Sequence, residues 1–503
     1  MNEIQDVSAS NRTTSGIPAR TLAAAPKVRL DRRFWVFSLV ATMLLSWPLL
    51  VFGRPSYIQD SAAYYKGGRA AVNYALAKVD RSEESPTAKT ITADSASGAV
   101  SRETAGNEIK AARSITYSIA TYALSAPRAT LTLLAFAQAA AAAMIIVATL
   151  GAFDGLPPRR TTMALVAIAF ATTVAPVSFL VIPDIFAGLL IAIMVLLATA
   201  LSRLSLGVRS LCVGIAAFAV TAHPSNIPLA AGMTALGLGW ISVGHFRKLT
   251  QAKWAWLWVG APMLIGGLTL LGVNSVAFGE TSLAGKRYPF ALSRSINNGP
   301  GRWYLEKNCP HLRYAICQVY PHGLPKGGAL QFLWGPDGVT SRATSAQMDR
   351  IRAEEAEIVL AASREYPAHE ARRLATALGW QLVRFWPVPF DERMTLDSTG
   401  TPQLLPEPKA SYWIPSLVYI VTAIGAAIGC IWLGWIFVKK HSARPVIALL
   451  FLGILGNAVT CVLFAAMAPR YQARVVWLVP LFALAIRPAN TTSSRSEDAE
   501  PVG

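Results

Sequence analysis

Residues 412–438, YWIPSLVYIVTAIGAAIGCIWLGWIFV, contain no Asp, Glu, Lys or Arg, and Lys439 and Lys440 follow directly. An α-helix rises about 1.5 Å per residue, so roughly 20 apolar residues are enough to cross about 30 Å of hydrocarbon. The segment is long enough for that, and the two lysines mark a return to water. We therefore predict that it spans a membrane.

Nine other segments of similar character extend this prediction to the whole chain. Of the 503 residues, 53% are hydrophobic and 15% are charged, whereas soluble proteins average about 25% charged residues. The apolar residues are gathered in blocks, which predicts an all-α polytopic membrane protein with about ten transmembrane helices. The predicted spans are 34–53, 128–151, 161–182, 185–201, 210–222, 227–243, 254–278, 412–438, 446–468 and 471–487.

The basic residues predict how these helices are oriented. The formal net charge is +18, and many of the basic residues lie in short loops that counting spans places on one face. Loops rich in Lys and Arg stay in the cytoplasm, so both termini are expected there. The positive charge is explained by the orientation of the helices in the membrane, so nucleic acid is not an expected partner. The lipid bilayer is one. The groups are Arg29, Arg32 and Arg33; Arg159 and Arg160; Arg203 and Arg209; Arg247, Lys248 and Lys253; Lys439, Lys440 and Arg444; and Arg487.

Five regions follow from this topology. Two long segments, 54–127 and 279–411, are extracytoplasmic, and the middle of the first, 81–110, has the composition of a flexible insertion. The regions are a disordered basic tail, 1–33; an N-terminal transmembrane region, 34–278; an extracytoplasmic domain, 279–411; C-terminal transmembrane helices, 412–487; and a second cytoplasmic tail, 488–503.

The extracytoplasmic domain is predicted to contain a pair of helices. Thr344 and Gln347 fit a capping box at the start of the first helix, and Pro367 separates it from the second. The second helix has an apolar face, so it could lie flat on the membrane or pack against the rest of the domain. The residues of that face are Ala371, Leu374, Leu378, Leu382 and Phe385.

Membrane insertion does not explain five groups of polar residues, and the topology puts all five at the outer face. This convergence of distant parts of the chain is the main sequence argument for a functional site. The groups are Tyr57–Tyr65 with Asp60 and Tyr64; Ile182-Pro183-Asp184; His223–Asn226; Arg113–Tyr117; and Arg470–Arg474 with Tyr471.

Each group has a structural explanation beside the functional one. Asp60 is either a solvated loop residue or a general base or cation ligand. Asp184 suits a helix N-cap, although an ionisable residue near the membrane is costly unless it is used. His223 is a lone histidine, which is more often structural. The arginines either bind phosphate or anchor in the headgroup region with their chains along the membrane surface.

These groups resemble the GT-C superfamily, membrane glycosyltransferases that use polyprenyl-phosphate-linked sugars. Asp60 matches by position the catalytic or metal-binding Asp of the superfamily's first extracytoplasmic loop, and Asp184 resembles its second acidic position. Arg470-Tyr471 resembles the Arg-Tyr often found before the final helices. The chain differs from the superfamily at Ser61, since a Glu usually follows the first Asp.

The chain is more closely similar to a group of uncharacterised bacterial polytopic membrane proteins, which brings no known activity. The resemblance covers most of the chain. It rests on IPDIFAGLL from residue 182, HPSNIPLA from 223, GPGRWYLEKNCP from 299, YAIC from 314 and RYQARVVWLVP from 470.

The GT-C resemblance implies an enzyme at the periplasmic face of a bacterial inner membrane, with a polyprenyl-phosphate lipid as its partner. Asp60 and Asp184 are the expected catalytic residues. The sequence leaves open whether a divalent cation serves as a cofactor, and no residue is assigned as its ligand. A transporter, which would carry ionisable residues near the bilayer midplane, and a non-catalytic envelope assembly protein are the alternatives. The expected substrate-binding residues are Tyr64, Arg113, Tyr117, His223, Asn226, Arg470, Tyr471 and Arg474.

Cys309 and Cys317 lie in the segment placed outside the cytoplasm, where disulfides persist. The residues between them include Pro310 and can turn tightly enough to bring the two Cα atoms within about 4.4–6.8 Å. We predict a disulfide between them, with two free thiols as the alternative.

Overall fold

The computed structural model describes residues 27–83, 113–125, 130–246, 254–285, 287–387, 390–398, 400–406, 413–464 and 467–486. Most of both predicted tails and of the 81–110 insertion therefore lies outside the described residues. The described structure is mostly helical, at 76%. Six helices in it are long and apolar enough to cross a membrane, which confirms the coarse prediction of a helical membrane protein. They cover Arg32–Phe52, Thr132–Asp154, Asn226–Val243, Ala255–Ala277, Trp413–Lys439 and His441–Phe464.

The other four predicted spans are helical but short or interrupted, so the count of ten transmembrane helices is not confirmed. The third is broken between a 13-residue and a 5-residue helix, and the last between helices of 7 and 8 residues. A 15-residue helix is only about 22 Å long. The helices concerned are α7 (Pro158–Phe170) with α8 (Val174–Ser178), α9 (Ile185–Thr199), α10 (Leu206–Ala222), and α22 (Arg470–Val476) with α23 (Leu478–Ala485).

The short helix α9 lies at the centre of the bundle. Its residues from Ile185 to Ala198 are all buried, and it packs against helices on several sides. Apolar residues there meet protein rather than lipid, which explains why apolarity alone does not identify a span. The helices that it contacts are α6 (Thr132–Asp154), α10, α11 (Asn226–Phe246), α12 (Ala255–Phe278), α21 (Arg444–Phe464) and α22.

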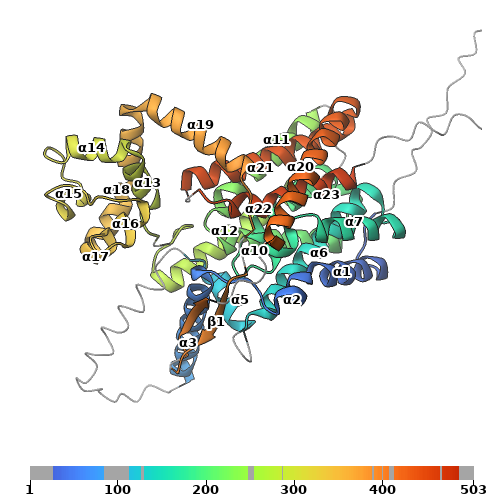
Figure 1. Ribbon diagram of the computed structural model, residues 1–503, viewed down its shortest axis with the longest axis horizontal. Coiled ribbons are helices and arrows are strands. Elements are labelled where there is room, and N and C mark those ends of the chain that lie inside the picture. Colours follow the sequence, from blue (N-terminus) through green and yellow to red (C-terminus); the bar gives the residue numbers. More distant parts are fainter. Residues whose placement is uncertain are drawn as a thin grey trace, which may run out of the picture.

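The remaining bundle helices surround this centre. α1 (Arg32–Leu45) and α2 (Trp47–Phe52) form the first candidate span, and α20 (Trp413–Lys439) packs against α23 and α21. α3 (Gln59–Glu83) and α5 (Ile115–Ala123) form a packed pair that projects to one side (Figure 1).

A second hydrophobic core belongs to the helices between Phe290 and Glu365, which lie apart from the bundle in Figure 1. The capping box between Thr344 and Gln347 is present at the start of α18, as predicted. The buried carboxylate of Glu355 accepts hydrogen bonds from two backbone N–H groups in the first turn of α13, and its burial raises its pKa. The helices are α13 (Phe290–Asn298), α14 (Pro300–Asn308), α15 (Ala315–Val319), α16 (Ala329–Trp334), α17 (Val339–Arg342) and α18 (Ser345–Glu365).

The amphipathic helix α19 (Pro367–Val383) joins this domain to the bundle (Figure 1). It packs against α21 and α22, and Gln381 donates a hydrogen bond to the backbone oxygen of Ala468 at 3.2 Å. The sequence left two partners open for its apolar face, the membrane and the rest of the domain. In the structure, Phe385 at the end of this face is buried against Tyr419 of α20, whereas Ala371 is exposed. The residues that α19 buries are Glu370, Ala377 and Gln381, so it meets the bundle mainly through a different face.

A β-hairpin contradicts the all-α prediction in one place. β1 (Glu392–Leu396) pairs antiparallel with β2 (Pro402–Pro406), with Met394 opposite Leu404. Gly400 takes a φ of +71° in the connecting turn, a conformation that glycine adopts without strain. Each strand has only five residues, too few for a clear alternating pattern, and β2 packs beside α3.

Cys309 and Cys317 are joined by a disulfide in the structure, with their Cα atoms 5.4 Å apart. We expect thiol labelling of the denatured protein to modify three cysteines before reduction, since Cys212, Cys430 and Cys461 are free. After reduction all five cysteines of the chain should react. Labelling of all five without reductant would show that the bond does not form in the native protein.

Candidate functional site

The site begins at the first turn of α3, where Asp60 lies. Ser61 accepts a hydrogen bond from the backbone N–H of Ile58 at 3.1 Å, which fixes the entry into the helix. A carboxylate in the first turn is favoured by the helix dipole. The side chain of Asp60 keeps 39% of its surface exposed, so the carboxylate remains open to solvent.

Two arginines converge on this carboxylate. One Nη of Arg113 donates to Oδ1 of Asp60 at 2.7 Å, and one Nη of Arg470 lies 3.6 Å from Oδ2. Burial alone would raise the pKa of Asp60, but the two guanidinium groups outweigh it and hold the pKa below its ordinary value. Asp60 is therefore ionised at neutral pH, and each carboxylate oxygen faces a cation.

Arg113 is held in place by the start of α5. Ser114 caps this helix by accepting the N–H of Tyr117 at 3.1 Å. The hydroxyls of Ser114 and Thr116 both donate to the backbone oxygen of Thr221 at the end of α10. These bonds bring the returning end of the first long loop beside the turn between α10 and α11.

That turn carries His223 and Asn226. The backbone N–H of Ser225 donates to Nδ1 of His223 at 3.1 Å, which assigns the proton of the neutral ring to Nε2. Burial and the nearby Arg474 lower the pKa of His223 to about 4, so the imidazole is neutral at pH 7. The amide of Asn226 donates to the backbone oxygen of Ala219 at 2.8 Å.

A buried ion pair joins α9 to α22. Arg474 lies 3.2 Å from Oδ1 of Asp184, and the two side chains are only 1% and 2% exposed. The side chain of Asp184 does not cap α9, so the N-cap explanation is wrong for it. The headgroup explanation is wrong for Arg474, because its guanidinium lies inside the protein.

Other polar groups complete the shell of Arg474. Oδ1 of Asn457 accepts from its Nε at 3.0 Å and from one Nη at 2.8 Å, while Ser225 lies 3.3 Å from that Nη. The pair needs these bonds because a buried charge with unsatisfied donors is costly. Gly188 makes the approach of α9 and α22 possible, since a Cβ there would lie 2.5 Å from the backbone oxygen of Arg474.

Tyr471 links this buried pair to Asp60. The guanidinium carbons of Arg470 and Arg474 each lie 5.0 Å from the centre of its ring, and Arg470 donates to its hydroxyl at 3.2 Å. The two arginines are one helical turn apart on α22. One therefore faces the half-exposed Asp60 and the other the buried Asp184.

Tyr64 and Tyr117 are buried in the protein interior next to these groups. Their rings meet edge to face at 4.9 Å, and both side chains are buried. The hydroxyl of Tyr117 donates to Gln138 at 2.9 Å, and Gln138 donates in turn to the backbone oxygens of Ser178, the last residue of α8, and of Leu180. Burial suits these tyrosines to supporting the site rather than to touching a substrate.

The structure thus brings the sequence-predicted residues of all five groups into one region of contacts. Sequence reasoning missed Asn457 and Gln138, which hold Arg474 and Tyr117. A lone amide inside an apolar span was the available signal, because such groups need partners within the protein. Ser225 was part of a quoted motif but was assigned no role.

The residues do not fit a divalent cation. In the part of the chain that the structure describes, no group of three or more His, Cys, Asp and Glu side chains could hold a metal ion. Asp60 and Asp184 each face a guanidinium, and a cation placed between carboxylate and arginine would be repelled. We therefore derive no step through a metal.

Comparison with known proteins found no matching family model, no matching curated protein and no matching solved structure.

Proposed function

We propose that the protein is a GT-C-like glycosyltransferase that uses a polyprenyl-phosphate-linked sugar at the periplasmic face of the bacterial inner membrane. The observation that carries this proposal is the convergence of Arg113 and Arg470 on the half-exposed carboxylate of Asp60. Such a group offers a proton acceptor and two phosphate-binding cations within a few ångströms.

In the proposed reaction, a hydroxyl oxygen of the acceptor forms a bond to C1 of the donor sugar. The bond from C1 to the phosphate oxygen breaks, and its electron pair stays on the polyprenyl phosphate. Asp60 takes the proton of the attacking hydroxyl. Arg113 and Arg470 bind the phosphate and stabilise the charge that it gains as it leaves.

The ion pairs of Asp60 couple the binding of the donor phosphate to the strength of Asp60 as a base. With both arginines at the carboxylate, the pKa of Asp60 is low and the group is a weak base. A phosphate that draws the guanidinium groups toward itself reduces their hold on Asp60, and its own negative charge raises the carboxyl pKa further. Asp60 thus becomes a stronger base when the donor is bound.

Asp184 has a different place in the proposal from Asp60. It is 1% exposed and is paired with Arg474, so it is a positioning residue rather than a group that touches the acceptor. The pair fixes α22, and α22 carries Arg470 toward Asp60. Ser225 contacts Arg474, and His223 hydrogen-bonds to Ser225, so both residues help to hold the buried pair in place.

A transporter remains the second candidate, because a buried ion pair lies beside the interrupted helices α22 and α23. Broken helices with ionisable residues are frequent at transport sites. A transporter is favoured less than the enzyme, because Asp184 and Arg474 are enclosed by protein. The solvent-accessible charged groups are those around Asp60.

Native mass spectrometry of the purified protein tests the proposed donor. We expect a co-purified polyprenyl-phosphate species that is depleted about a hundredfold or more in the double variant Arg113→Gln/Arg470→Gln, since charge-assisted bonds to phosphate contribute about 1.5–3 kcal/mol each. Arg313→Gln/Arg364→Gln removes the same charge elsewhere and should retain the lipid. Absence of any polyprenyl lipid from the wild-type protein, even after incubation with it, contradicts the proposal.

A further inference from the structure

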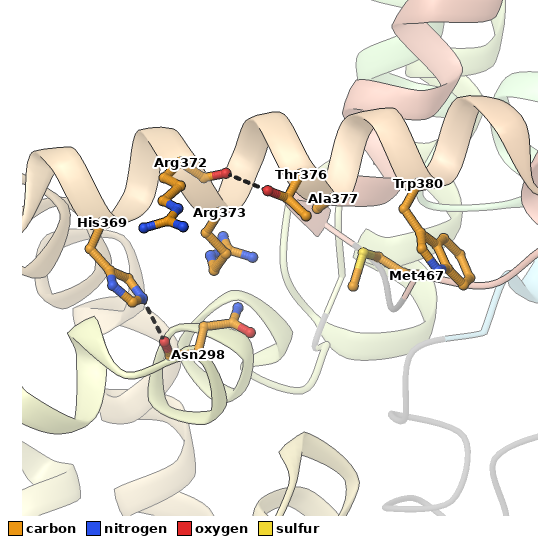
Figure 2. Close-up of a pocket in the computed structure, with 8 residues that line it drawn as sticks. All are labelled: Asn298, His369, Arg372, Arg373, Thr376, Ala377, Trp380 and Met467. Atoms are coloured by element: carbon orange, nitrogen blue, oxygen red, sulfur yellow. Dashed lines mark hydrogen bonds between the residues drawn. The ribbon is translucent and has the colours of Figure 1, made fainter.

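A cavity of about 380 Å³ lies beneath α19, away from the contacts around Asp60. Figure 2 shows α19 above it and Asn298, at the end of α13, below it. Met467, from the segment before α22, lies near its other end. The lining residues are Asn298, His369, Arg372, Arg373, Thr376, Ala377, Trp380 and Met467.

One end of the cavity is cationic. Arg373 is bound to Glu370 at 3.0 Å, which neutralises one positive charge, and His369 lies 3.2 Å from the backbone oxygen of Asn298. Among the described residues, the guanidinium of Arg372 has no hydrogen-bond or ion-pair partner. Figure 2 shows its side chain reaching down from α19 beside that of Arg373. This end therefore carries one exposed guanidinium that no described group of the protein neutralises, and it is open to an anionic ligand.

The other end is apolar and lies at the end of a membrane-type helix. Trp380 and Met467 line it, and Met467 is 45% exposed. Met467 follows the candidate span that ends at Phe464 by three residues. Trp residues collect where hydrocarbon meets headgroups. The cavity therefore lies where the candidate span ends, which is where we expect a membrane boundary.

We propose that this cavity binds the phosphate headgroup of a membrane lipid. Arg372 holds the phosphate oxygens, with His369 beside it, and the first part of the lipid chain lies along Trp380 and Met467. Arginine suits phosphate because its planar fork donates two parallel hydrogen bonds. The volume is within the range of about 300–1,000 Å³ of small-molecule sites, enough for a headgroup but not for a whole lipid.

The site is distinct from the one around Asp60 and does not depend on the proposed transfer reaction. It is nevertheless coupled to that region by the chain, because Met467 precedes Arg470 by three residues and α19 is tied to Ala468. A phospholipid and a polyprenyl phosphate share the required chemistry of a phosphate on a long apolar chain.

Lipid binding to the full-length protein in phosphatidylcholine nanodiscs tests the proposal. Two probes distinguish the source of the phosphate: phosphatidylglycerol in one set and polyprenyl monophosphate in the other. We expect Arg372→Gln to weaken binding of at least one probe about tenfold, as loss of one charge-assisted contact predicts. Arg364→Gln removes an exposed arginine of α18 with the same change of charge and should bind as the wild type does.

Thr376→Trp provides an independent variant, because it fills the cavity without removing a cation. It should also weaken binding of the same probe, and unchanged thermal unfolding would show that both variants fold. The Arg113→Gln/Arg470→Gln variant separates the two sites. If the α19 site takes a phospholipid, this variant loses polyprenyl phosphate and keeps phosphatidylglycerol; if it takes polyprenyl phosphate, the binding that remains in this variant is the part that Arg372→Gln removes. Binding of neither probe, or equal binding by wild type, Arg372→Gln and Thr376→Trp, would overturn the proposal.

Discussion

Replacing Asp60 with Asn is expected to reduce sugar transfer by roughly 10²–10⁴-fold, the contribution of a positioned general base. The amide keeps the shape of the carboxylate but cannot take the proton of the acceptor. The measurement is the rate at which polyprenyl phosphate is released from the donor in lipid vesicles. Asp60 is partly exposed, so the fold should survive and thermal unfolding should change little.

The binding of the donor should respond in the opposite way. In the Asn variant, Arg113 and Arg470 no longer have a carboxylate to satisfy, so both are free for phosphate. We expect kcat to fall while KM stays constant or decreases, because the lost interaction belongs to the transition state. Asp337→Asn breaks the exposed ion pair with Arg342 and should leave activity unchanged. Activity above a tenth of the wild-type value would remove Asp60 from the mechanism.

The pH profile gives the same test without a substitution. The low pKa of Asp60 in the resting protein means that the carboxylate is ionised down to acidic pH. Activity should therefore fall as the pH is lowered through the pKa of the donor-bound state, which the bound phosphate raises above the resting value. The Asn variant should lose this acidic limb.

The sequence predicted where the helices form better than how many of them cross a membrane. Each of the ten apolar segments overlaps a helix, because local apolarity and helix formation go together in such a chain. The number of spans depends on how long and how continuous each helix is, and the breaks between α7 and α8 and between α22 and α23 are set by tertiary packing. α9 is apolar throughout and lies at the protein centre, which composition cannot reveal.

For the site, the sequence likewise predicted which residues are present better than how they pair. Its charged residues were visible in the sequence because charges at the edges of apolar segments need a reason to be there. Their pairing was not visible, since Asp184 and Arg474 are 290 residues apart and meet only through the packing of α9 and α22. The cavity under α19 required the same kind of tertiary information, because Met467 and Arg372 come from separate elements.

Breaking the buried pair should have the largest effect on stability. Arg474→Met leaves the carboxylate of Asp184 buried among groups arranged for an arginine, and Asp184→Leu leaves an uncompensated guanidinium. Removing one partner of a buried pair costs about 3–5 kcal/mol. Thermal unfolding of the solubilised protein should show a clear decrease in Tm for both variants. The exposed pair of Arg342 and Asp337 supplies the control, since Arg342→Met should change Tm little.

The double variant Asp184→Leu/Arg474→Met decides whether the pair itself or its unpaired remainder is responsible. Apolar residues of similar size carry no buried charge, so the double variant should unfold at a higher temperature than either single variant. Activity should nevertheless stay low in the double variant, because Asn457 and Ser225 lose the guanidinium that holds α22 in place. If the double variant is as active as the wild type, the pair does not position Arg470. If the decrease in Tm of the double variant equals the sum of the decreases of the two single variants, Asp184 and Arg474 do not act as a pair.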